Sequence, residues 1–171
     1  MHHTRKIGKI DRMPLKSLHI RNAAESDLPT IIAMLADDAL GSRREDASIP
    51  LDPAYLRAFQ AIESDANQQL VVAEQDDAIV GTLQLSFLPG LSYKGAWRGQ
   101  IEAVRIAKSL RGQGLGAQFI TWAVDRCRAR GCHLVQLTSN SVRLDAHRFY
   151  ERLGFAKSHA GFKLTLDGDQ A

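Results

Sequence analysis

Three glycines, each separated from the next by one residue, lie between a β-like apolar run and a long amphipathic run. Residues 111–117 read Arg-Gly-Gln-Gly-Leu-Gly-Ala, the run 101–107 before them is typical of a strand, and apolar residues recur at helical spacing from Leu115 onward. A compact apolar segment at 134–138 predicts a second strand after this helix. A strand, a crossover helix and a strand place the two strands parallel in one sheet, with a right-handed connection.

The rest of the pattern predicts antiparallel strands and further helices. The β-rich runs 70–74 and 79–88 are separated by Asp76, Asp77 and Ala78, which indicates a hairpin although its tip has no glycine. The other predicted elements are, in chain order, a short strand over 18–23, a helix over 27–38, a helix capped by Asp52 with Pro53 in its first turn, the helix from Leu115 to a C-terminal cap at Gly131, a helix over 146–153 that Gly154 ends, and a last strand over 162–166.

These elements predict an α/β fold of the α+β type. We expect one mixed, mostly antiparallel sheet of six to seven strands, covered by about four helices, in which only the strands on either side of the crossover helix run parallel. The 171 residues fit a single domain, with 44% hydrophobic and 24% charged residues, as in ordinary globular proteins. We assign that domain to 18–171 and a basic tail to 1–17. Both Met1 and Met13 are candidate starts of the chain.

Charge and cysteine content narrow the class of protein. The net charge of +3 comes from basic residues spread along the chain, which is weak evidence for nucleic acid, so no nucleic-acid partner is expected. Cys127 and Cys132 match no four-ligand zinc spacing, and we expect neither a metal nor a disulfide. The first dozen residues lack the apolar stretch of a secretory signal, and no run is long enough to span a bilayer. We therefore expect a cytoplasmic protein without a membrane partner.

The glycine turn is suited to binding phosphate. The first amides of a helix have no partner inside the helix and face the positive end of its dipole, while glycines let the backbone approach a diphosphate closely. A P-loop would need Lys and Ser or Thr after Gly116, where the chain has Ala117 and Gln118, and the glycine spacing also differs from the dinucleotide fingerprint. The alternative is that the glycines only make a tight turn.

Two motifs in order resemble those of a known family. Arg-x-x-Gly-x-Gly at 111–116, preceded by Val-Arg-Ile at 104–106 and followed by an amphipathic helix, resembles the acetyl-CoA motif of the GNAT acetyltransferase superfamily. Asn140 and the run Ala-His-Arg-Phe-Tyr-Glu-Arg-Leu-Gly-Phe at 146–155 resemble its second signature. The resemblance covers roughly 18–166. Family members often carry a proline in the turn after the strand, which this chain lacks.

The resemblance implies an N-acetyltransferase with acetyl-CoA as the acetyl donor and the primary amine of a small molecule or peptide as the acceptor. The family is often dimeric, so a homodimer is also implied. The residues that match the family's cofactor-binding positions are Val104, Arg105, Ile106, Arg111, Gly112, Gln113, Gly114, Leu115, Gly116, Ala117 and Asn140.

Two residues are candidates for proton transfer. Alternation along the strand places Glu102 on one face with Val104 and Ile106, and the family often uses a carboxylate there as a general base acting through water. Tyr150 matches the family's tyrosine near the CoA sulfur, where a phenol can protonate the departing thiolate. Glu102 can also be an arginine partner or leave the base to a chain of waters, and Tyr150 can simply pack. His147 remains unassigned.

The alternative function is a non-catalytic acyl-CoA sensor that regulates a partner; the presence of both Glu102 and Tyr150 favours an enzyme. The acceptor stays open. Acidic residues between the first two helices favour a cationic amine, whereas basic residues in the loop 89–99 favour an acceptor with a carboxylate or phosphate. The residues concerned are Asp37, Asp38, Glu45, Asp46 and Asp52 on the one hand, and Lys94 and Arg98, beside Tyr93 and Trp97, on the other.

Overall fold

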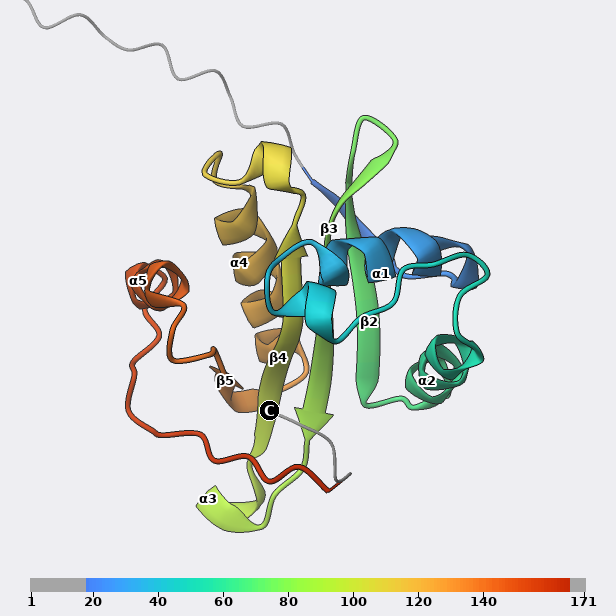
Figure 1. Cartoon of the computed structure of the whole chain (residues 1–171). Coiled ribbons are helices and arrows are strands. Elements are labelled where there is room, and N and C mark those ends of the chain that lie inside the picture. Colours follow the sequence, from blue (N-terminus) through green and yellow to red (C-terminus); the bar gives the residue numbers. More distant parts are fainter. Residues whose placement is uncertain (1–17, 167–171) are drawn as a thin grey trace, which may run out of the picture.

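The computed structural model describes residues 18–166, which form one five-stranded mixed sheet with helices on both faces (Figure 1). The strands lie in the order β1-β2-β3-β4-β5, and only β4 and β5 are parallel neighbours. Their bounds are β1 His19–Asn22, β2 Gln68–Gln75, β3 Ala78–Leu88, β4 Trp97–Ile106 and β5 Cys132–Leu137. The mixed sheet and its parallel pair are confirmed. The tail predicted over 1–17 lies outside the described residues.

Five α-helices accompany the sheet in the described part of the chain, one more than predicted. They are α1 Leu28–Ala36, α2 Pro53–Ser64, the short α3 Ser92–Gly95, α4 Leu115–Ala129 and α5 Leu144–Arg152. The Asp52 side chain accepts a hydrogen bond from the Ala54 amide at the start of α2, as its sequence predicts. Gly131 has a φ of +80° just after α4, which is the left-handed cap that a glycine allows. Within the described residues, no helix is both long and apolar enough to cross a bilayer.

The β2–β3 hairpin is confirmed, and its turn explains why it needs no glycine. Asp76 and Asp77 form the two-residue connection with φ values of +51° and +60°. Such left-handed angles match the twist of a hairpin, and aspartate adopts them more readily than most residues with a side chain.

The core lies between the sheet and α4. Phe119, Ile120 and Ala123 of α4 are completely buried against the central strands. A Cβ on Gly99 in β4 would lie 2.3 Å from the Cys127 sulfur, so helix and strand approach one another too closely for any side chain at that position. Figure 1 shows α1 on the other face of the sheet.

The strand predicted over 162–166 is wrong. This segment has no regular structure, and its apolar side chains are 95%, 85% and 88% exposed at Phe162, Leu164 and Leu166. Alternating apolar residues predict a strand only where another strand supplies hydrogen bonds and a neighbouring layer covers one face. Neither is present for this segment, so the described residues hold five strands and not six or seven.

Candidate active site

The two parallel strands separate before β4 ends. Pairing between β4 and β5 runs from Trp97 opposite Cys132 to Ile101 opposite Leu137, where β5 stops, while β4 continues to Ile106. The edge of β4 over residues 102–106 that faces α5 therefore has no strand partner. The carbonyls of Val104 and Ile106 accept hydrogen bonds from the Arg105 and Arg111 side chains, and the other outward backbone groups of this edge are available to a ligand.

A bulge interrupts β4 at this opening. Ala103 has a φ of +52°, and Ala103 and Val104 together oppose the single residue Leu83 of β3. A bulge bends the strand and changes which residues share a face. It occurs where β4 leaves β5, so it helps to open the sheet.

The bulge overturns the predicted face of Glu102. Register places Glu102 opposite Gln84 and Arg105 opposite Thr82, and these two β3 residues lie on one face because they are two positions apart. Glu102 therefore shares a face with Arg105, towards α1. The strict alternation that grouped Glu102 with Val104 and Ile106 fails because the bulge adds one residue.

The glycine turn leaves a row of amides free. Gly112 and Gly114 have φ values of +79° and +86°, which a residue with a Cβ rarely adopts. The Ala117 amide already donates to the Gly114 carbonyl at 3.1 Å. Among the described residues, no hydrogen bond uses the amides of residues 112–116, and these N–H groups surround the first turn of α4.

The third glycine, Gly116, lies at the contact between α4 and α5. A Cβ on Gly116 would lie at an ordinary contact distance of 3.4 Å from the Phe149 ring, so α5 packs directly against the start of α4. Packing here fixes the position of Tyr150, the next residue of α5.

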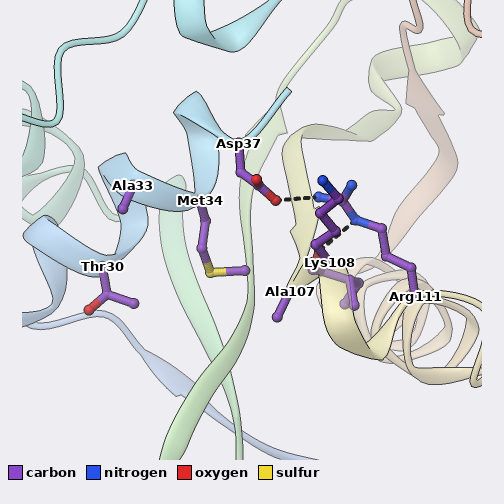
Figure 2. A pocket seen from close by; sticks show the side chains of 8 residues that line it. Thr30, Ala33, Met34, Asp37, Ala107, Lys108 and Arg111 are labelled. Carbon is purple, nitrogen blue, oxygen red and sulfur yellow. Dashed lines mark hydrogen bonds and ion pairs between the residues drawn. The ribbon is translucent and has the colours of Figure 1, made fainter. Parts of the chain in front are cut away.

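The Arg111 side chain points towards Asp37, just after α1 (Figure 2). Its Nε donates to the Ile106 carbonyl at 2.9 Å, and its Nη2 lies 3.1 Å from Oδ2 of Asp37. Between α1 and the end of β4 lies a pocket of about 280 Å³, whose apolar wall includes Ala33 and Met34. The Arg111–Asp37 pair forms its polar rim.

Tyr150 lies within an aromatic group on α5. Its ring contacts those of Phe149 and Phe155, with centroids 5.1 and 5.9 Å away. Burial raises the pKa of the phenol, and the positive charges of Arg105 and Arg143 oppose this rise only in part. The hydroxyl is therefore protonated at neutral pH and is suited to donating a proton.

The remaining predicted residues differ in whether their side chains form hydrogen bonds within the protein. Glu102 is exposed, and no hydrogen bond or ion pair of the described residues uses its carboxylate. The Asn140 side chain accepts the Val142 amide at 3.0 Å, and Nε2 of His147 lies 3.0 Å from the Asn140 carbonyl. Asn140 and His147 thus hold the turn before α5, which gives His147 a structural role.

The loop 89–99, whose basic residues favour an anionic acceptor, lies at the other end of β4 from the glycine turn. Its short helix α3 precedes Trp97, whereas the glycine turn follows Ile106, and a strand rises about 3.3 Å per residue, so roughly 30 Å separate them. Figure 1 shows α3 at the end of β4 far from α1. No group of three or more metal-ligating side chains occurs among residues 18–166.

Comparison with known sequences decides the family. The sequence model of the acetyltransferase (GNAT) family matches residues 33–155 of the chain. The chain belongs to this family. It is thus an acyltransferase, an N-acetyltransferase that uses acetyl-CoA as its donor.

Individual relatives agree with this assignment. The aminoalkylphosphonate N-acetyltransferase of Salmonella typhimurium is 31% identical over 156 residues, which cover 91% of this chain and 95% of that protein. The L-methionine sulfoximine/L-methionine sulfone acetyltransferase of Pseudomonas paraeruginosa is 29% identical, over 81% of this chain and 80% of that protein. A crystal structure from Bacillus halodurans, described as a transcriptional regulator, superimposes with a TM-score of 0.85 at 49% identity, over 88% of this chain and all of that one.

The sequence did not indicate that Asp38 and Arg143 form a pair at the opening. Neither residue belongs to a sequence motif, because Asp38 follows α1 by two residues and Arg143 lies in the turn before α5. They are 105 positions apart and meet at 2.7 Å. No periodicity or motif signals such a pair.

Proposed function

We propose that this acetyltransferase moves the acetyl group directly onto the primary amine of a small molecule or peptide at the opening between β4 and β5. The observation that carries the proposal is the convergence of three features at one end of the sheet. The unpaired edge of β4 leads to the free amides at the start of α4, and the protonated phenol of Tyr150 belongs to the helix packed beside them.

The fit to acetyl-CoA rests on the backbone. Free amides at residues 112–116 would bind the diphosphate, and the edge of β4 at residues 104–106 would hydrogen-bond the pantetheine arm. Arg111 would add charge after leaving Asp37, an exposed ion pair that costs little to break. When bound, acetyl-CoA supplies the acetyl group activated as a thioester.

Glu102 is proposed as the general base. An amine like that of lysine has a pKa near ~10.4 and is mostly protonated at neutral pH, yet only its neutral form attacks. The Glu102 carboxylate is exposed and unpaired within the described residues, so it can accept this proton through a bridging water. Its place on the face towards α1 assigns the acceptor to that side of the sheet.

Tyr150 is proposed as the general acid. The departing sulfur is a thiolate, and a phenol that keeps its proton at neutral pH can protonate it. The burial that raises the pKa of Tyr150 supports this role, because it keeps the proton on the hydroxyl until the thiolate forms.

The test is release of CoA from acetyl-CoA in the presence of free amino acids, aminophosphonates, polyamines, aminoglycosides and peptide N-termini. We expect turnover with at least one class, and a fall in kcat of about tenfold or more for both Tyr150→Phe and Glu102→Gln, with acetyl-CoA affinity unchanged. Unchanged kcat in both variants would remove the assigned roles.

One observation favours a second function. The Bacillus halodurans chain, 49% identical, is described as a transcriptional regulator, which fits the alternative of an acyl-CoA sensor. Tight binding of acetyl-CoA without turnover of any acceptor would support the sensor. Turnover of an acceptor would support the enzyme, and any regulatory role would then be additional to catalysis.

A further inference from the structure

Arginines gather around one aspartate just after α1. Nη2 of Arg143 donates to Oδ2 of Asp38 at 2.7 Å, and Nη2 of Arg105 lies 3.7 Å from the same oxygen. Burial lowers the pKa of Arg105, Asp38 raises it, and the charges of Arg143, Arg44 and Arg111 lower it further. Three further guanidinium groups are thus close enough to act on Arg105.

Asp38 does not neutralise this charge. Its Oδ1 accepts the amides of Leu40 and Gly41 at 3.0 and 2.7 Å, so only Oδ2 faces the arginines. Burial works against its ionisation, but the Gly41 amide and the charges of Arg143 and Arg105 outweigh burial and hold the pKa of Asp38 below its ordinary value. Asp38 is therefore already ionised at neutral pH, and one negative charge serves two arginines.

Arg105 is also short of hydrogen-bond acceptors. Its side chain is only 13% exposed. Nη1 donates to the Val104 carbonyl at 2.9 Å, whereas the buried Nε has no partner among the described residues. A buried guanidinium N–H without an acceptor is unfavourable, and a planar oxyanion matches its donor geometry.

The place of these arginines points to the acceptor and not to the cofactor's diphosphate. Arg105 lies on the face of β4 that carries Glu102, and the charges of Arg105 and Arg143 both act on the Tyr150 phenol. The amides suited to the diphosphate lie elsewhere, at the start of α4. An oxyanion bound here would lie on the same face of β4 as Glu102, the proposed base for the amine.

We propose that Arg105 and Arg143 form an oxyanion subsite for the acceptor, so that the preferred substrates are amines bearing a phosphonate, phosphate or carboxylate group close to the amine. This inference rests on the proposed function, because it names the substrate class of the same site. The substrates in the names of the Salmonella and Pseudomonas relatives, an aminoalkylphosphonate and two amino acids, combine an amine with an oxyanion.

The first experiment compares matched acceptors that differ only in the anion. Aminoethylphosphonate is paired with its diethyl ester, and β-alanine with its methyl ester. We expect kcat/KM for the anionic member of at least one pair to exceed that of its ester by about 30-fold, as one or two charged hydrogen bonds allow. Esterification lowers the pKa of the amine and so increases the neutral fraction that can attack at neutral pH, which means that amine protonation alone favours the ester and cannot produce this preference. The pair with the larger ratio of kcat/KM between anion and ester shows whether the subsite prefers a phosphonate or a carboxylate.

The second experiment changes the arginines. Arg143→Gln should lower kcat/KM for the anionic acceptor by about 30-fold and reduce its preference over the ester, while Arg143→Lys should recover part of the loss because it retains the charge. Arg105→Gln should act in the same direction, and melting curves verify that each variant folds. Arg128→Gln is the matched control, since Arg128 is an exposed arginine of α4 whose one ion pair within residues 18–166 is with Asp125.

A third measurement does not depend on turnover. Methylphosphonate should inhibit competitively against the amine and not against acetyl-CoA, and calorimetry should detect its binding to the wild type but not to Arg143→Gln. Equal kcat/KM for anionic and neutral acceptors would overturn the subsite and leave the acetyltransferase intact. Arginine-dependent methylphosphonate binding without any turnover would retain the subsite and reject the proposed catalysis. Weaker acetyl-CoA binding in both arginine variants, with no change in preference, would assign the arginines to the cofactor and refute the proposal.

Discussion

The proposed donor side and the proposed acceptor side of the opening are built in different ways. The donor side comes from consecutive residues, because the free amides of 112–116 follow from two left-handed glycines and the first turn of one helix. The acceptor side brings together Asp38, Arg105 and Arg143 from three distant parts of the chain. A site made of adjacent residues keeps its geometry when the rest of a fold varies, whereas a site made across the fold can change with it. This contrast explains why cofactor binding can be read as a motif and acceptor choice cannot.

The largest effect expected of any single change is on the donor side. Gly114→Val places a branched side chain at a φ of +86°, which is strained and moves the amides that follow. Acetyl-CoA affinity measured by calorimetry should fall by about 100-fold, since several charged hydrogen bonds change together. Gly90→Ala is the control, because a Cβ there meets its nearest atom at an ordinary 3.6 Å. Retained affinity in a folded Gly114→Val protein would refute the amide cradle.

Tyr150 is the proposed general acid, and loss of its hydroxyl should lower the rate of turnover alone. Tyr150→Phe should lower kcat by about 30-fold with no change in acetyl-CoA affinity, because a general acid acts on the departing group only. Burial raises the pKa of Tyr150, so wild-type kcat should not decline through loss of this proton between neutral pH and the ordinary pKa of tyrosine. Tyr93→Phe, at an exposed tyrosine at the far end of β4, should leave kcat unchanged. A decline in acetyl-CoA affinity equal to that in kcat would show a packing role instead.

Away from the opening, the ion pairs of Arg21 with Asp27 and Glu74 anchor the start of α1 and should make stability depend on pH. Arg21 donates to Asp27 at 2.6 Å and to Glu74 at 2.5 Å, and the hydrogen bond from Arg21 is the largest cause holding the pKa of Asp27 below its ordinary value. Asp27→Asn should lower the free energy of unfolding at pH 7 by about 1.5 kcal/mol, or about 4 °C in Tm.

The sign of the pH dependence follows from the lowered pKa. The contribution of Asp27 is fully present above its unfolded pKa and is lost as the pH falls through its folded pKa, so the Tm difference between the wild type and Asp27→Asn should shrink only in acid. Asp65→Asn, at an exposed carboxylate in the turn after α2, serves as the comparison. A Tm difference that stays constant down to low pH would exclude the ionised carboxylate as its cause.

The smallest effect is expected at the exposed ion pair between Asp37 and Arg111. Asp37→Asn releases Arg111 from its ion pair, and acetyl-CoA should then bind about threefold more tightly, since exposed ion pairs contribute at most about 1 kcal/mol. Calorimetry beside Asp125→Asn, which removes a similar exposed pair on α4, isolates the effect. Weaker binding would mean that Asp37 positions Arg111 and does not restrain it.

Much of the fold follows from local sequence. The hairpin, the Asp52 cap of α2 and the cap of α4 at Gly131 depend on residues a few positions apart, and all three are confirmed. The strand over 162–166 was predicted from the same kind of pattern and is wrong. A strand depends on a partner strand and on a covering layer, which alternation in one segment does not reveal.

In the candidate site, too, contiguous motifs predicted some features and missed those that depend on distant residues. The glycine turn and Tyr150 were visible because their motifs are contiguous, whereas the face of Glu102 was mistaken because a bulge at Ala103 shifts the alternation by one. Nothing in the spacing indicated that Arg143 lies beside Asp38.

The sequence by itself determined the parallel unit with its glycine turn, and through two motifs the family and the donor. Backbone angles at glycines and the unpaired amides of a helix start are properties of adjacent residues, so they can be read along the chain. The tertiary structure alone decided where β4 leaves β5, which face carries Glu102, and which arginines surround Asp38. Those features depend on strand register and on the packing of distant elements, in which one extra residue or one turn of helix changes the neighbours of a side chain.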